Sequence, residues 1–115
     1  DQIINWVSEN IESSKVDLIW FQSNSEGDII DKLHWAIDNQ IVGVIINPGA
    51  YTHYSYAIRD AISSIEIPTI EVHLSNIDRR ENFRKISVIE DVCKKQIKGK
   101  GKEGYLEAVN LFLKS

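Results

Sequence analysis

The sequence has one cysteine, two prolines and no methionine among its 115 residues. The single thiol, Cys93, excludes an internal disulfide framework and a cysteine-rich metal site. It favours a reducing, cytoplasmic setting. The apolar runs are also far shorter than the roughly 20 residues of a membrane-spanning helix. With 43% hydrophobic residues, we expect residues 1–115 to form a single domain with its own core.

Basic residues are outnumbered by acidic ones, 13 to 17, and the formal net charge is −4. This balance argues against a nucleic-acid binder of the usual basic kind. Nine of the 13 basic residues nevertheless lie between Arg79 and Lys102. A solvated surface is the simpler explanation of that clustering, and a small anionic ligand drawn to this part of the chain is the alternative.

Helical and strand-like segments alternate along the chain. Apolar residues recur at helical spacing in residues 1–13, 26–39, 54–64 and 105–113. Short apolar runs typical of strands occupy residues 16–21, 42–46, 69–74 and, less clearly, 94–98. This alternation predicts an α/β fold, with a doubly wound parallel sheet between two layers of helices. The lysine-rich last run is expected at a sheet edge, where charge discourages pairing with other chains.

Polar residues gather where three of the predicted strands end. The strands are followed by or end in "QSNSEGD", "NPGAYTH" and "EVHLSN". Because ligands of open parallel sheets bind outside the carboxyl ends of the strands, these amides, hydroxyls and imidazoles are expected at one rim. The sequence therefore predicts a binding or catalytic site there.

The Asn-Pro-Gly corner has a mechanical explanation that covers only part of it. Pro48 fixes its own φ angle, and Gly49 can adopt the positive φ that a tight corner needs. Making a turn does not explain Asn47, whose amide is held at the strand tip, or His53 just beyond. We therefore treat Asn47 and His53 as candidate site residues.

His73 is the strongest candidate for chemistry. Glu71 precedes it with one residue between, so both side chains point to the same face of the predicted strand. A carboxylate next to an imidazole fixes its tautomer and stabilises its protonated form. A purely structural role for the pair is the alternative.

Other kinds of site are less well supported. His34 lies mid-helix and is expected to be an ordinary surface or packing residue, while His53 and His73 have no further ligand at zinc-binding spacing. No G-x-S-x-G nucleophile elbow is present. "GKGKEG" lacks the Walker pattern and is better explained as a turn and helix start.

The motifs together resemble one known family. "FQSNSEGDIIDKLHWA", "GVIINPGAYTHYSYAIRDAI", "IPTIEVHLSNIDRRENFRKIS" and "GKGKEGYLEAVNLFL" are similar, in order and spacing, to the type II 3-dehydroquinate dehydratases, over essentially the whole chain. The resemblance implies a flavodoxin-like, three-layer fold and a dodecamer built as a tetramer of trimers. It implies a lyase of the shikimate or quinate pathway, used in aromatic amino acid biosynthesis. Such an enzyme converts 3-dehydroquinate to 3-dehydroshikimate by anti elimination through an enolate, without a metal or organic cofactor.

The resemblance also assigns roles to individual residues. His73 matches the general acid that protonates the leaving hydroxyl, and Glu71 matches its orienting carboxylate. The substrate-binding residues implied are Asn47, His53, Asp60, Leu74, Ser75, Arg80 and Arg84. Asp60 is expected to reach in from a neighbouring subunit, Leu74 and Ser75 to hold the substrate carboxylate, and Arg84, supported by Arg80, to contact the ring hydroxyls.

The chain departs from the family pattern at its start. The family opens with a strand and a lid loop that carries an arginine and the tyrosine base, and no segment here matches either, so we expect the domain to be N-terminally incomplete. A base-less module that binds a small carboxylate, inactive in this form, is the alternative function. An unrelated receiver or flavin carrier is a third hypothesis, but neither a phosphate-binding first loop nor an acidic phosphorylation pocket is apparent.

Overall fold

The computed structural model describes residues 2–11, 16–77 and 86–114. Arg80 and Arg84, two predicted substrate-binding residues, lie outside this part of the chain. The elements in chain order are α1 (Gln2–Asn10), α2 (Glu26–Asp38), β1 (Val44–Ile46), η1 (Gly49–His53), α3 (Tyr56–Ile65), β2 (Thr69–His73), η3 (Glu90–Val92), β3 (Lys95–Lys98) and α5 (Glu103–Leu113).

The described strands form a parallel sheet in the order β1-β2-β3. Ile46, the last residue of β1, pairs with Glu71, and His73, the last residue of β2, pairs with Lys98 at the end of β3. The carboxyl ends of all three strands therefore lie at the same edge of the sheet. Neighbouring strands are about 4.8 Å apart, so side chains leaving these ends are within reach of one another.

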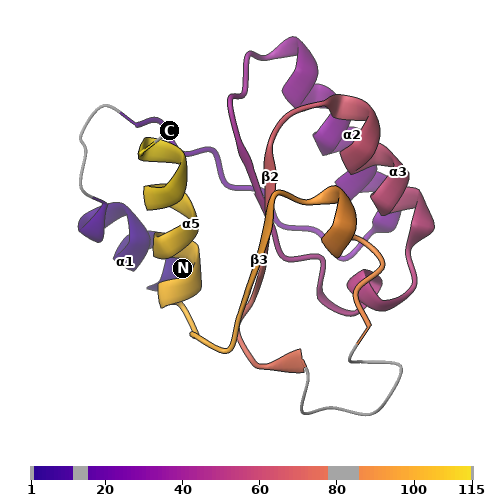
Figure 1. Ribbon diagram of the computed structural model, residues 1–115. Coiled ribbons are helices and arrows are strands. Elements are labelled where there is room, and N and C mark those ends of the chain that lie inside the picture. Colours follow the sequence, from indigo (N-terminus) through magenta and orange to yellow (C-terminus); the bar gives the residue numbers. More distant parts are fainter. Residues whose placement is uncertain (1, 12–15, 78–85, 115) are drawn as a thin grey trace.

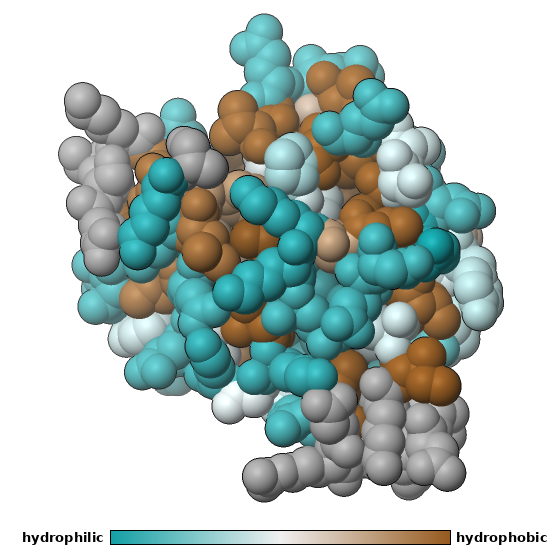
Figure 2. Space-filling view, viewed as in Figure 1, coloured by the Kyte–Doolittle hydropathy of each residue, from teal (hydrophilic) through white to brown (hydrophobic). Residues whose placement is uncertain are grey.

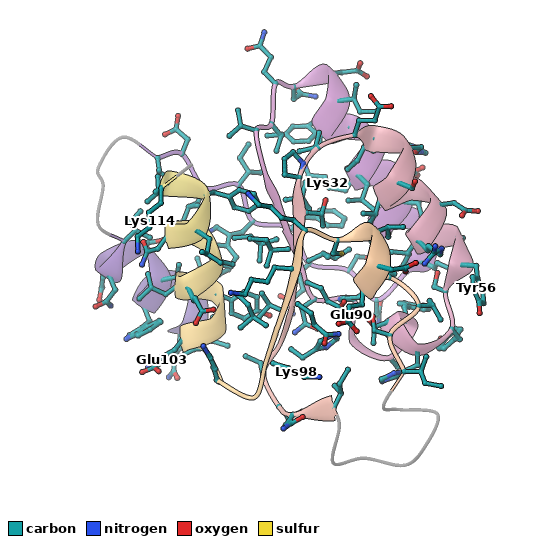
Figure 3. All side chains as sticks on the ribbon, viewed as in Figure 1. Lys32, Tyr56, Glu90, Lys98, Glu103 and Lys114 are labelled. Carbon is teal, nitrogen blue, oxygen red and sulfur yellow. The ribbon has the colours of Figure 1, made fainter. Side chains whose placement is uncertain are left out.

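Helices cover both faces of the sheet (Figure 1). On one face α2 and α3 pack over β1, with Leu33, Ile46, Ile58 and Ile62 in the core between them. On the other face α5 packs over β2 and β3 through Ala108, and α1 lies against α5. Side chains fill the space between the sheet and both helix layers (Figure 3). The predicted three-layer α/β arrangement is confirmed.

Residues 16–21 were predicted as a strand, and this prediction is wrong. The segment has no strand structure, and three of its apolar residues are exposed, Ile19 by 57%, Trp20 by 38% and Phe21 by 48%. A strand is stabilised by hydrogen bonds to a neighbour, and no strand in the described residues pairs with this segment. Consequently "QSNSEGD" does not leave a strand end.

The helix that follows the Asn-Pro-Gly corner starts two residues later than predicted. Ser55 caps α3, because its hydroxyl accepts the backbone N–H of Ile58 at 3.1 Å. The corner leads into η1, a short 3-10 helix over Gly49–His53. Gly49 has the positive φ expected of it, 61°. Two residues separate β1 from η1, and two separate η1 from α3.

The lysine-rich strand β3 pairs only with β2 among the described strands, as predicted for an edge. Hydrophilic side chains cross the middle of the face shown in Figure 2, over the region that β3 occupies in Figure 1. Among the described helices, none is long and apolar enough to cross a membrane.

Candidate active site

Glu71 and His73 form a buried pair at the end of β2. Glu71 is 0% exposed and His73 is 5% exposed. Because side chains alternate along a strand, both leave the same face, and Nε2 of His73 hydrogen-bonds to Oε2 of Glu71. The ionised carboxylate only accepts hydrogen bonds, so Nε2 carries a proton and Nδ1 is the ring atom left for a substrate.

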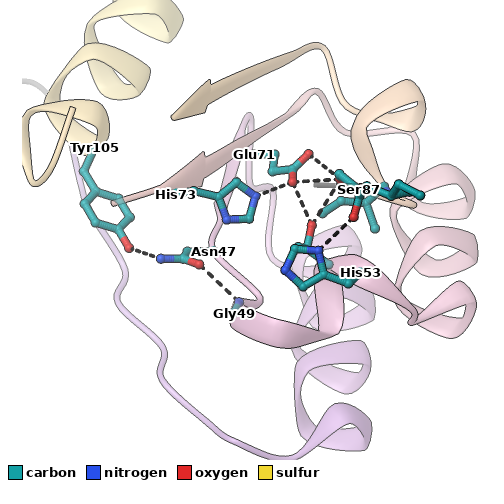
Figure 4. A network of polar contacts seen from close by, with 10 residues as sticks. Asn47, Gly49, His53, Glu71, His73, Ser87 and Tyr105 are labelled. Atoms are coloured by element: carbon teal, nitrogen blue, oxygen red, sulfur yellow. Dashed lines mark hydrogen bonds and ion pairs between the residues drawn. The ribbon is translucent and has the colours of Figure 1, made fainter. Parts of the chain in front are cut away.

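Two hydroxyl groups complete the surroundings of the Glu71 carboxylate. Thr52 of η1 donates to Oε2 at 2.7 Å. Ser87 donates to the same carboxylate, at 2.8 Å from Oε2 and 3.0 Å from Oε1. Figure 4 shows this network beside the His73 ring.

These contacts keep Glu71 charged although it is buried. Burial acts to raise the pKa of Glu71, but hydrogen bonds from His73, Thr52 and Ser87 outweigh it, and the pKa lies below its usual value. Since the pKa is lower in the folded chain than in the unfolded one, the carboxylate stabilises the fold at pH values above the usual glutamate range. That stabilisation is lost as the pH falls through the lowered pKa.

The amide of Asn47 is held in one orientation at the end of β1. Its Oδ1 accepts the backbone N–H of Gly49 at 3.1 Å, and its Nδ2 donates to the phenol oxygen of Tyr105 at 2.9 Å (Figure 4). An amide nitrogen has two protons, so one remains to donate to a ligand. From the register of β1 and β2, Asn47 lies one strand spacing and one residue step from His73.

The imidazole of His53 is also fixed. Its Nδ1 is 2.8 Å from the carbonyl oxygen of Ile86, which can only accept a hydrogen bond. Nδ1 therefore carries the proton, and Nε2 faces away as a possible ligand contact. The structure thus brings Asn47, His53 and His73 to the same end of the sheet, as the sequence predicts.

The remaining predicted site residues in the described part of the chain are Leu74, Ser75 and Asp60. Leu74 and Ser75 directly follow His73 and are exposed, and the carbonyl of Leu74 accepts the N–H of Gly101 at 2.9 Å, which anchors this exit to the loop before α5. Asp60 is exposed on α3 and makes no hydrogen bond with Glu71 or His73. Its predicted contact with a neighbouring subunit lies beyond a single chain.

Sequence reasoning missed three residues of the network, Thr52, Ser87 and Tyr105. Each is a common residue type in an unremarkable local pattern, and its role comes from a contact over a long sequence separation. Tyr105 lies 58 positions from Asn47 and Thr52 lies 19 from Glu71. Within "NPGAYTH", only Asn47 and His53 were selected as candidate site residues. Thr52, whose hydroxyl donates to Glu71, lies between them.

Two surface hollows lie elsewhere. One, of about 360 Å³, is lined by residues of α1 and α5, and another, of about 530 Å³, by residues of α1 and the 16–20 segment. Neither is lined by Asn47, His53 or His73. Within the described ranges, no group of three His, Cys, Asp or Glu residues is arranged to hold a metal ion.

Comparison with known proteins gives consistent matches over nearly the whole chain. Residues 1–113 match the family model described as dehydroquinase class II. A 3-dehydroquinate dehydratase from Caldicellulosiruptor saccharolyticus is 52% identical over 109 residues, covering 95% of this chain and 75% of that protein. One from Bacillus subtilis is 56% identical over 102 residues, covering 89% of this chain and 68% of that protein.

Solved structures show the same likeness. The type II dehydroquinase from Butyrivibrio crossotus superposes with a TM-score of 0.93 at 50% identity, covering 99% of this chain and 79% of that one. The type II dehydroquinase from Propionibacterium acnes gives a TM-score of 0.86 at 35% identity, covering 99% and 75%.

Proposed function

Because the chain belongs to the dehydroquinase class II family, we propose that it is a lyase that dehydrates 3-dehydroquinate to 3-dehydroshikimate, with His73 as general acid. The reaction removes a proton α to the ketone, passes through an enolate, and expels the hydroxyl as water. The observation that supports this most strongly is the buried Glu71–His73 pair at the carboxyl edge of the sheet.

The arrangement of His73 suits the second half of the elimination. Hydroxide is a poor leaving group, so the departing oxygen needs a proton from a positioned acid. The hydrogen bond from Nε2 to Glu71 aims Nδ1 away from the core, and the carboxylate stabilises the imidazolium before its proton is given up. After transfer the neutral ring remains hydrogen-bonded to Glu71.

The substrate is proposed to lie over the ends of β1 and β2. A polyhydroxylated carboxylate needs several fixed donors, and the strand ends supply them. Asn47 offers the free proton of its amide, and Leu74 and Ser75 are proposed to hold the carboxylate through backbone N–H groups and the Ser75 hydroxyl. His53 offers its unprotonated Nε2 as an acceptor for a substrate hydroxyl. Arg84, supported by Arg80, remains a prediction from the family resemblance, and Asp60 is proposed to act on the substrate of a neighbouring subunit.

The proposed assembly is the family's dodecamer, a tetramer of trimers, and the proposed setting is the cytoplasm. Tyr54, just before α3, and Tyr56, its first residue, are 58% and 65% exposed and lie close in sequence to Asp60. A surface of this kind supports a subunit contact around Asp60. The presence of a single cysteine, Cys93, is compatible with a reducing compartment.

The function is tested by supplying 3-dehydroquinate to the full-length protein and following the enone absorbance of the product. We expect a rise in absorbance that depends on protein concentration. If the protein binds 3-dehydroquinate, measured by calorimetry, but absorbance stays flat, the lyase proposal fails and the base-less carboxylate-binding module is favoured.

A further inference from the structure

Three side chains from three different segments converge on the Glu71 carboxylate. His73 comes from β2 itself, Thr52 from η1, and Ser87 from the segment that leads into η3. Thr52 and Glu71 are both 0% exposed and Ser87 is partly buried, so bulk solvent has little access to these contacts. His73 has a proposed role as the acid, whereas the two hydroxyl groups have none so far.

The geometry shows that both hydroxyl groups act as donors to a negative charge. The oxygen of Ser87 accepts the backbone N–H of Ile89 at 3.3 Å, which leaves its single proton for Glu71. Thr52 donates its proton to Oε2 at 2.7 Å. The oxygens of Thr52 and Ser87 are 3.1 Å apart, so the two groups approach the carboxylate from adjoining positions.

Two titratable side chains, His73 and Cys93, interact electrostatically with Glu71. His73 faces it along β2, and Cys93 approaches it from the segment before β3. Burial first, and then the negative charges of Glu71, Asp91 and Glu90, raise the pKa of the Cys93 thiol to about 12, so the thiol stays neutral. Neutral donors, together with His73, therefore keep Glu71 ionised.

The same residues also connect the parts of the site. The backbone carbonyl of Thr52 accepts the N–H of Val88 at 2.8 Å, next to Ser87. His53, which follows Thr52, contacts the carbonyl of Ile86 on the same segment. The corner after β1, the end of β2 and residues 86–89 are thus held in register around one carboxylate.

We propose that Thr52 and Ser87 are positioning residues for the acid: their hydroxyl groups hold Glu71 ionised and in one orientation, so that it keeps the His73 ring aimed at the substrate. The inference rests on the proposed function for its kinetic consequences. The effect of the two hydroxyl groups on the charge of Glu71 can be measured without enzyme turnover.

The electrostatic part is tested by following the carboxyl carbon-13 signal of Glu71 against pH by NMR. In the native protein we expect Glu71 to titrate below the usual glutamate range. In Ser87→Ala and Thr52→Val, which each remove one donor, we expect it to titrate at higher pH than in the native protein. Thr52→Ser keeps the hydroxyl and is expected to titrate as the native protein does. Thr69→Val is the matched control and should leave the titration unchanged, because Thr69 is a buried threonine of β2 whose hydroxyl donates to the carbonyl of Ile67.

The kinetic part uses the same variants with 3-dehydroquinate. Hydrogen bonds to charged groups contribute enough that we expect kcat to fall roughly 10- to 100-fold in Ser87→Ala and Thr52→Val, with KM nearly unchanged. The acidic limb of the pH–kcat profile should move to higher pH, because Glu71 is protonated earlier. Thr52→Ser should restore both kcat and the profile.

Several results would overturn the inference. One is a native Glu71 that titrates above the usual range, which is decisive even if a variant does not fold. Another is a kcat that is lower in Thr52→Ser than in Thr52→Val, because this would show that the methyl group of Thr52 matters rather than its hydroxyl. If the native protein shows no turnover, the proposed function fails, but the Glu71 titrations still decide whether the hydroxyl groups hold the charge.

Discussion

Single side chains at the rim are fixed by contacts that leave one polar atom free. Asn47 uses its oxygen and one proton internally, His53 uses Nδ1, and His73 uses Nε2. Each then offers a single remaining donor or acceptor toward the strand ends. Such preorganisation lowers the entropy that binding a small polar ligand costs.

Tyr105 is predicted to matter through Asn47. Tyr105→Phe removes the oxygen that accepts from Nδ2, so the amide loses one of its two anchors. A net hydrogen-bond contribution of about 0.5–1.5 kcal/mol predicts a KM for 3-dehydroquinate roughly 2- to 10-fold higher, with a smaller change in kcat. Steady-state kinetics measures both.

The control for this prediction is a double-mutant cycle. If Tyr105 acts through Asn47, Tyr105→Phe has no further effect on KM once Asn47 has been changed to alanine. Additive effects of the two changes would show that Tyr105 acts on the substrate independently.

At the level of elements, the first turn of helix α5 packs tightly against the sheet at Gly104. A Cβ atom added to Gly104 would lie 3.1 Å from Cγ1 of Val72 and 3.3 Å from Cγ2 of Ile97. Gly104 therefore lets the first turn of α5 pack directly on β2 and β3. The next residue is Tyr105, so this close approach also places its phenol against Asn47.

Gly104→Val is predicted to destabilise the fold by overpacking this contact. We expect a loss of about 1–3 kcal/mol in the free energy of unfolding, measured by urea denaturation. Gly27→Ala is the control, because its Cβ would have no neighbour closer than 3.9 Å in the first turn of α2, and about 0.4–1 kcal/mol of added stability is expected. Equal stability of Gly104→Val and the native chain would contradict the packing described for α5.

Most elements could be predicted from the sequence, because periodicity and capping are local. The predicted helix at 26–39 is found as α2 (Glu26–Asp38), and β2 follows its predicted run to within one residue. The strand prediction for residues 16–21 was wrong because their apolar run is typical of a buried strand. Strand structure also requires a neighbouring strand, which a local sequence pattern does not reveal. The Glu71–His73 pair could be predicted from its spacing, whereas Thr52 and Ser87 depend on tertiary contacts.

For the whole molecule, the proposed site needs residues from more than one chain. Asp60 is exposed on α3 and does not reach the Glu71–His73 pair of its own chain. If it serves a neighbour, each complete site combines His73 from one subunit with Asp60 from another. Light scattering is then expected to give a mass that is a multiple of that of one chain, twelvefold for the proposed dodecamer.

Subunit mixing tests this sharing directly. Asp60→Ala and His73→Ala are each expected to abolish most turnover when prepared alone. When the two variants are dissociated and reassembled together, some sites recover both residues, and activity should return. Recovery is not expected if Asp60 acts within its own subunit, so a mixture as inactive as its components would contradict the shared site.

The role of His73 as the acid of the elimination is tested by the rate of enone formation from 3-dehydroquinate in the full-length protein carrying His73→Ala. His34→Ala, which changes an exposed histidine on α2, is the matched control. We predict that kcat falls roughly 10²- to 10⁴-fold in His73→Ala and stays at the native value in His34→Ala. Undiminished turnover in His73→Ala would remove His73 from the mechanism.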